Sequence, residues 1–142
     1  MYEKCLFFNL NSFTRSVNKR WEEEFEKLGL SASHGYLLRL VLSRPGSTQK
    51  LLADELDLAP STVTRFLETL EQKGFVKKTC CTEDGRAMTV EPTKKAQTIA
   101  QELEEASARL SKFLVEKLGP ESADELVEIL KSSQSKMTEK RN

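Results

Sequence analysis

The sequence predicts a mainly α-helical fold with one small β-hairpin, which places it in the α+β class. Apolar residues recur at three- and four-residue steps over most of the 142-residue chain, as they do in amphipathic helices. Residues 75–92 interrupt this pattern with two short runs of β-type residues around the turn-forming sequence EDGR. The composition, 38% hydrophobic and 31% charged, is ordinary for a single globular domain.

Two helices are predicted in the first 43 residues. The first extends from Cys5 to Leu28, with its apolar positions at Leu6, Leu10, Phe13, Val17, Trp21, Phe25 and Leu28. Gly29 ends it. The second is capped by Ser31 or Ser33, and the sequence RPG at residues 44–46 ends it.

Two further helices follow, separated by the short turn DLAPS. Ser47 or Thr48 opens the first of them, with its apolar positions at Leu52, Ala53 and Leu56. The second begins near Pro60, because proline fits a first helical turn, where its missing N–H would be unpaired anyway. Alanine is a poor N-cap, so Ser61 is an alternative to Ala59 as the capping residue. Gly74 ends this helix.

The hairpin is followed by two more helices. Pro92 closes the second strand, and helical spacing then continues from Thr93 to Leu118. The sequence GPES at 119–122 ends that helix and caps a last one, before a frayed tail. The predicted order is therefore α, α, α, α, β, β, α, α.

This order indicates a helix-turn-helix with a two-stranded wing over residues 31–92, flanked by a helical region formed from residues 1–30 and 93–142. An apolar stripe of about 24 residues, at 1.5 Å per residue, is about 36 Å long. The small middle region cannot cover it. We therefore expect a second copy of the chain to cover the flanking helices, within one intertwined domain.

The helix after Pro60 has one face suited to a DNA groove. Its apolar side chains, Val63, Phe66, Leu67 and Leu70, share one side. The opposite side carries Ser61, Thr62, Thr64 and Arg65. Small hydroxyl side chains allow the backbone close to base edges, and an arginine can bond a guanine at two points. Because this helix follows a helix-turn and precedes a hairpin, the pattern favours nucleic-acid binding over an ordinary solvated face.

Other function classes lack support. The 22 basic and 22 acidic residues balance, although residues 60–95 are slightly basic. The three cysteines, Cys5, Cys80 and Cys81, suit neither a disulfide framework nor a metal knuckle, so we expect reduced thiols. With one histidine and no glycine-rich phosphate loop, we expect no catalytic site, metal or cofactor. No run is long and apolar enough for a membrane span, so a cytoplasmic protein is expected.

The chain resembles the MarR family of bacterial winged-helix transcription regulators over essentially its whole length. The resemblance is carried by TQKLLADELDLAPSTVTRFLETLEQKGFVKK at residues 48–78, by the wing TEDGRAMTVEPTKKA at 82–96, and by the long flanking helices. It implies a homodimer joined by its terminal helices. Each subunit would lay its fourth helix in a major groove of a pseudo-palindromic operator and its wing along the minor groove.

The resemblance also implies roles for individual residues. Ser61, Thr62, Thr64 and Arg65 would meet bases or nearby phosphates. In the wing, Arg86 would enter the minor groove, Asp84 would orient it, and Gly85 would permit the tight turn. Phosphate contacts are expected at Thr48, Gln49, Lys77 and Lys78, although the two lysines are equally consistent with solvated strand residues.

In the family, a small aromatic molecule or cysteine oxidation often weakens DNA binding. The candidate pocket residues here are Phe13, Trp21, His34 and Tyr36, although aromatic residues at helical spacing more often belong to the core and a lone histidine near a helix start is more often structural. Cys5 is the candidate thiol sensor, because a helix N-terminus favours a thiolate. The expected function is sequence-specific binding of double-stranded DNA by a repressor that such a signal releases. The alternative is a winged-helix module that binds proteins and not DNA.

Overall fold

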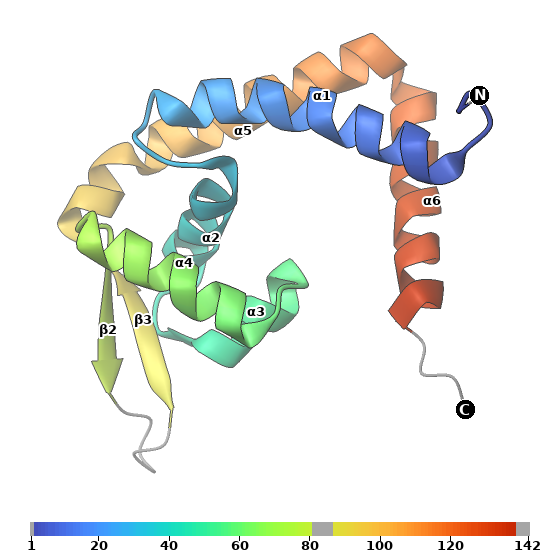
Figure 1. The fold of residues 1–142 in the computed structure, drawn as a ribbon. Coiled ribbons are helices and arrows are strands. Elements are labelled where there is room, and N and C mark those ends of the chain that lie inside the picture. The colour runs from blue at the N-terminus through green and yellow to red at the C-terminus, as the bar shows by residue number, and fades with distance from the viewer. Residues whose placement is uncertain (1, 81–86, 139–142) are drawn as a thin grey trace. The chain divides into compact units, whose positions relative to one another are not determined.

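The computed structural model describes residues 2–80 and 87–138. Its elements occur in the order α1 (Leu6–Glu26), α2 (Ala32–Ser43), β1 (Ser47–Thr48), α3 (Gln49–Leu56), α4 (Pro60–Gln72), β2 (Val76–Cys80), β3 (Met88–Pro92), α5 (Lys94–Leu118) and α6 (Pro120–Thr138) (Figure 1). The six predicted helices and the two hairpin strands are confirmed. The chain forms two compact units, Met1–Ala106 and Ser107–Asn142. The predicted boundaries of the helix-turn-helix and flanking regions stay a prediction.

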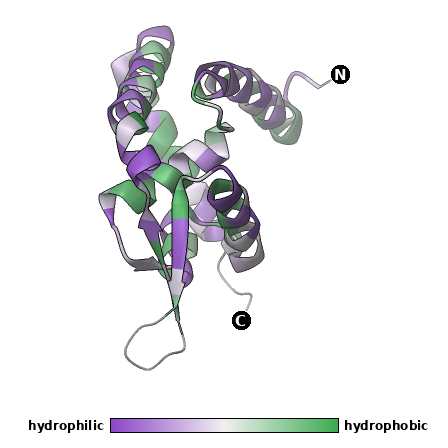
Figure 2. Cartoon of the chain, turned by 90° about the vertical axis from the view of Figure 1, so that its left-hand side faces the viewer, coloured by the Kyte–Doolittle hydropathy of each residue, from purple (hydrophilic) through white to green (hydrophobic). Residues whose placement is uncertain are grey.

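The first unit has a hydrophobic core to which its helices and its sheet contribute. Hydrophobic and hydrophilic residues are interspersed along the helices, as the hydropathy colouring shows (Figure 2). The side chains with no exposed surface are Phe25, Leu37, Leu38, Val41, Leu52, Val63, Leu67, Leu70, Val90, Ala96 and Leu103. Three of them, Val63, Leu67 and Leu70, belong to α4. Burial of this row determines which side of α4 faces outward.

The sheet has three antiparallel strands in the order β1-β3-β2. The hairpin register runs from Val76 opposite Pro92 to Cys80 opposite Met88. The sequence did not predict β1, because two residues are too few to show an alternating pattern. β1 exists because Ser47 pairs with Val90 of β3, a contact between residues far apart in the sequence.

The start of α4 corrects one sequence-based alternative. Ala59, not Ser61, occupies the N-cap position, and its side chain makes no capping bond. The backbone carbonyl of Ala59 accepts hydrogen bonds from the N–H groups of Thr62 and Val63, at 3.0 and 3.1 Å. Because Pro60 has no N–H to satisfy, the helix can begin there without a side-chain cap. Ser61 therefore lies inside the first turn.

The second unit comprises the last turns of α5, together with α6. Ser107, Leu110 and Ala123 are its buried side chains. Most of α6 is exposed, including the apolar side chains Val127, Ile129, Leu130 and Met137. In the first unit, the N-terminal part of α1 likewise exposes Leu6, Phe7, Phe8 and Leu10, and only Phe25 of α1 is buried. No helix within residues 2–80 or 87–138 has the length and hydropathy to cross a membrane.

His34 belongs to α2, and its ring packs against α4. Its ring meets the Phe66 ring edge-on, with 4.7 Å between the centroids. Burial, followed by the positive charge of Lys73, lowers the pKa of His34, and Arg65 acts in the same direction while Glu22 opposes it. His34 is therefore neutral at pH 7, and its role in the fold is packing.

Gly35 allows α2 to approach α1. A Cβ at this position would overlap the buried Phe25 ring. We expect Gly35→Ala to lower the free energy of unfolding by about 1–3 kcal/mol despite alanine's better helix propensity, because the ring cannot move away without disturbing the core. Urea denaturation measures this. Ser33→Ala, at an exposed position of the same helix, should change stability by less than about 0.5 kcal/mol. An equally stable Gly35→Ala variant would show that the contact is not close.

The lowered pKa of His34 predicts that the folded protein loses stability in mild acid. The unfolded chain binds a proton at His34 near pH 6.5, whereas the folded chain, with its lowered pKa, does so only at lower pH. The free energy of unfolding should therefore fall as the pH drops from 7.5 to 5.5. His34→Phe keeps an aromatic ring against Phe66 and should remove that part of the fall. Urea denaturation of both proteins at each pH measures this. An equal fall in the free energy of unfolding for the wild type and His34→Phe would contradict the role of His34.

Candidate nucleic-acid interface and adjoining cavities

The outward side of α4 is polar and accessible. Ser61 and Arg65, one helical turn apart, are both exposed, and Thr62 and Thr64 are half-buried beside them. They lie opposite the buried row Val63, Leu67 and Leu70. The arrangement gives a slim polar surface on a helix that is held from behind, which is the geometry a major groove accepts.

Thr64 is joined to the preceding helix. Its hydroxyl lies 3.2 Å from Oε1 of Gln49 and 3.0 Å from the carbonyl oxygen of Pro60. Thr48 caps α3, since its side-chain oxygen accepts a hydrogen bond from the N–H of Leu51 at 3.2 Å. Thr48 and Gln49, two of the four residues expected to contact phosphates, therefore also have structural roles at the start of α3.

Arg65 is supported by a neighbouring ring. Its guanidinium carbon lies 5.6 Å from the centre of the Phe66 ring, within cation–π range. Phe66 in turn rests on His34. This stacking restricts where the arginine can point, so less conformational entropy would be lost when it binds a base.

Two lysines, Lys73 at the end of α4 and Lys95 of α5, hold the C-terminus of α4 in place. The Lys73 ammonium donates to the carbonyl of Gly29 at 2.7 Å, and the Lys95 ammonium donates to the carbonyl of Lys73 at 2.6 Å. Lys95 also lies 4.5 Å from the centre of the Phe75 ring. Sequence reasoning missed these contacts, although a lysine near a helix C-terminus is a known stabilising signal.

The described part of the wing carries two of the predicted residues. Lys77 is exposed on β2, whereas Lys78 is half-buried and its backbone N–H donates to the Glu71 carboxylate of α4 at 3.3 Å. Asp84, Gly85 and Arg86 lie outside the described residues. Within the described stretches, no group of three or more histidine, cysteine, aspartate or glutamate side chains could hold a metal ion.

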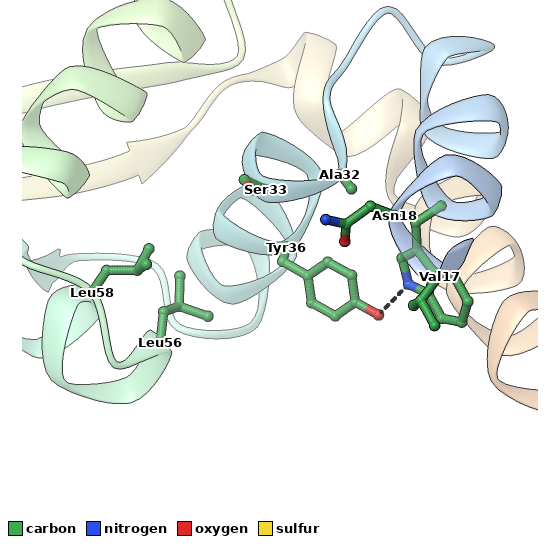
Figure 3. A pocket seen from close by; sticks show the side chains of 8 residues that line it. Val17, Asn18, Ala32, Ser33, Tyr36, Leu56 and Leu58 are labelled. Atoms are coloured by element: carbon green, nitrogen blue, oxygen red, sulfur yellow. Dashed lines mark hydrogen bonds between the residues drawn. The ribbon is translucent and has the colours of Figure 1, made fainter. Parts of the chain in front are cut away.

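A cavity of about 380 Å³ lies between α1, α2 and the end of α3, lined by Val17, Asn18, Trp21, Ala32, Ser33, Tyr36, Leu56 and Leu58. Tyr36 points toward α1, where its hydroxyl oxygen accepts a hydrogen bond from the Trp21 indole N–H at 3.1 Å (Figure 3). The structure thus brings together two of the four predicted pocket residues.

The other two predicted pocket residues lie elsewhere. Phe13 does not line this cavity, and the His34 ring packs on Phe66 of α4. Leu56 and Leu58 were not predicted, because they belong to a segment more than thirty residues along the chain from Trp21. Only tertiary packing places them beside the α1–α2 residues, so the sequence carries no local signal for them.

A second cavity, also about 380 Å³, shares Tyr36 and Leu56 with the first. Arg39 of α2 and Glu104 of α5 form part of its wall, joined by two hydrogen bonds of 2.8 Å. This hydrogen bonding raises the pKa of Arg39 and lowers that of Glu104. The Arg39 guanidinium also lies 5.2 Å from the centre of the Tyr36 ring. Tyr36 therefore links the first cavity to the contact between α2 and α5.

The described cysteines differ from one another. Cys5 is exposed, is not disulfide-bonded and occupies the N-cap position of α1, without a side-chain capping bond. The expectation of reduced thiols is wrong for Cys80, which is disulfide-bonded. Cys81 lies outside the described residues.

Comparisons with known proteins identify the family. The sequence profile described as MarR family matches residues 30–88. An uncharacterized HTH-type transcriptional regulator of Bacillus subtilis, YwoH, is 31% identical over 108 residues, which are 76% of each chain. This relative covers most of the chain at a level of identity that shows common descent.

Solved structures show the same fold at lower identity. The RdhR-CbdbA1625 regulator with bound 2,4-dichlorophenol has a TM-score of 0.85 and 23% identity, over 99% of this chain and 86% of that one. The S. aureus MepR–DNA complex has a TM-score of 0.84 and 18% identity, over 94% of this chain and 99% of that one. Together with the accessible polar face of α4, these findings show that the chain belongs to the MarR family of winged helix-turn-helix proteins and is a DNA-binding transcriptional regulator rather than an enzyme.

Proposed function

We propose that the exposed face of α4 enters the major groove of an operator and reads its bases. The observation that carries this proposal is the exposure of Ser61 and Arg65 above the buried row Val63, Leu67 and Leu70. Arg65 is the main base-reading side chain, because a guanidinium can bond guanine O6 and N7 together. Ser61, Thr62 and Thr64 contact neighbouring bases or phosphates.

The surroundings of α4 supply the sequence-independent contacts. Thr48, Gln49 and Lys78 act near the phosphates, and Lys77, exposed on β2, contributes a positive charge. The wing residues Asp84, Gly85 and Arg86 act at the minor groove. These contacts hold the protein in register on the duplex but do not select its sequence.

The active form is a homodimer that binds a pseudo-palindromic operator as a repressor. The support is the apolar surface left on the terminal helices, where Leu6 is 80% and Met137 is 83% exposed. Side chains of this size are usually covered in the functional assembly. Two recognition helices related by a twofold axis require half-sites about one helical turn apart, roughly 34–36 Å. A DNA partner supports a cytoplasmic location for the protein.

A small aromatic molecule is the proposed effector, bound in the cavity against Trp21 and Tyr36. The related RdhR-CbdbA1625 structure contains 2,4-dichlorophenol. In this chain the cavity offers a stacking surface and the polar side chains of Asn18 and Ser33. An occupant that moves Tyr36 would disturb the stacked Arg39 and its bonds to Glu104, and so alter the contact between α2 and α5. Oxidation of the exposed Cys5 is the proposed redox alternative. The protein-binding module without DNA binding is not favoured for a member of this family.

Replacement of Arg65 tests the recognition face. We expect Arg65→Ala to weaken binding to the cognate operator by about 1–3 kcal/mol and to relax sequence choice, because the bidentate contact is lost. Fluorescence anisotropy with cognate and random duplexes over a range of salt concentrations measures both effects. Arg65→Lys keeps the charge but not the planar fork, so it should retain random binding and lose cognate preference. Equal losses on both duplexes for Arg65→Ala would exclude a base-reading role.

The cavity proposal can be tested with the single tryptophan. Trp21 is the only tryptophan in the chain, so its fluorescence reports directly on the cavity. We expect 2,4-dichlorophenol to quench it saturably and to weaken operator binding. Ala32→Phe should fill part of the cavity and abolish the saturable quenching while leaving operator affinity within about twofold, because Ala32 is not part of the recognition face. Saturable quenching that persists in Ala32→Phe would place the ligand elsewhere.

A further inference from the structure

The hydroxyl group of Thr64 already has partners for its hydrogen. A threonine hydroxyl has one hydrogen to donate and two lone pairs that accept. Its two neighbours within the protein, the Pro60 carbonyl oxygen and Oε1 of Gln49, are both acceptors, at 3.0 and 3.2 Å. The hydrogen is therefore directed inward. What Thr64 offers to an outside partner is a lone pair, and not a donor.

The side-chain amide of Gln49 presents its oxygen to Thr64 and its nitrogen away from it. Its side-chain carbonyl faces Thr64, which leaves the NH₂ group of the same amide for another partner. Gln49 is the first residue of α3, next to the capping residue Thr48. Phosphate oxygens accept hydrogen bonds and carry no donor, so a phosphate near this helix start must be approached by the NH₂ side. DNA would thus hold the amide in the orientation seen here.

We propose that Gln49 is a positioning residue that, together with the Pro60 carbonyl, keeps Thr64 a hydrogen-bond acceptor in the groove, so that Thr64 selects a base with an exocyclic amine. In the major groove these amines are N6 of adenine and N4 of cytosine. Guanine and thymine present acceptor oxygens there, which would face the lone pair of Thr64 unfavourably. This inference rests on the proposed entry of α4 into the major groove.

The three hydrogen bonds of this relay run in one direction. The base amine donates to Oγ1 of Thr64, the Thr64 hydroxyl shares its one hydrogen between Oε1 of Gln49 and the Pro60 carbonyl oxygen, and Nε2 of Gln49 donates to a phosphate. Each group donates on one side and accepts on the other, so the bonds strengthen one another. A phosphate contact is thereby coupled to base choice, although Gln49 itself touches no base.

Selection of binding sites from a random duplex pool tests the proposal. The wild-type protein should select adenine or cytosine at one position in each half-site. Thr64→Val, which replaces the hydroxyl by a methyl group, should lose that preference at this position alone. Gln49→Lys can still donate to phosphate but cannot accept from Thr64. Because the Pro60 carbonyl remains as an acceptor for the Thr64 hydrogen, this variant should weaken the same preference without abolishing it and leave the preferences at other positions unchanged, a result that a merely structural role would not produce.

A base analogue makes the test specific to one atom group. Replacing the selected adenine by purine, or the cytosine by 2-pyrimidinone, removes only the amine. Wild-type affinity should fall about fivefold, the effect expected of one hydrogen bond, while the affinity of Thr64→Val should change by less than about twofold. Lys50→Gln is the control, because Lys50 is exposed on α3 next to Gln49 but does not contact Thr64 in the described structure. It should leave base preference unchanged.

The outcomes separate this inference from the recognition face on which it rests. If Arg65→Ala alters the selected sequence but Gln49→Lys and Thr64→Val do not, the relay is wrong and the recognition face stands. If none of the three variants alters base preference, both are wrong. Selection of guanine or thymine at the position that responds to Thr64→Val would also overturn the relay.

Discussion

The burial of one row of side chains on α4 determines the rest of the interface. Val63, Leu67 and Leu70 have no exposed surface, so the opposite side of the helix, with Ser61 and Arg65, must face outward. Burying three such side chains contributes about 1.5–3 kcal/mol each relative to exposure. Turning the helix to hide its polar side would lose this energy and desolvate an arginine. The orientation of the proposed recognition face therefore follows from ordinary core packing.

Polar contacts then set the position of α4 within that packing. Thr64 bonds Gln49 near the start of the helix, and Lys95 bonds the carbonyl of Lys73 at its end. Each contact joins α4 to a different element, α3 at one end and α5 at the other. Because bases are read over distances of one hydrogen bond, a helix that enters a groove must be held to within a fraction of an ångström. The two contacts restrain both ends of α4 against α3 and α5.

The two cavities lie against the same framework, through which the proposed effector would act. Tyr36 lines both, accepts a hydrogen bond from Trp21 of α1, and lies beneath Arg39, which binds Glu104 of α5. One aromatic side chain of α2 thus contacts Trp21 of α1 and, through Arg39 of its own helix, is linked to Glu104 of α5. A ligand that displaces it acts on contacts already present, because tightly packed residues move together.

Much of the secondary structure could be predicted from the sequence, because helices and turns depend on local patterns. The spacing of apolar residues predicts six helices, Pro60 and Gly74 mark the ends of α4, and the polar side of α4 follows from its periodicity. Tertiary structure alone decided the features that join distant segments. The strand β1 exists only through pairing with β3, Leu56 and Leu58 reach the cavity only by packing, and Arg39 meets Glu104 across 65 positions. His34 was expected in a pocket but packs on Phe66, since periodicity gives the side of a helix on which a residue lies and not the neighbour that it meets there.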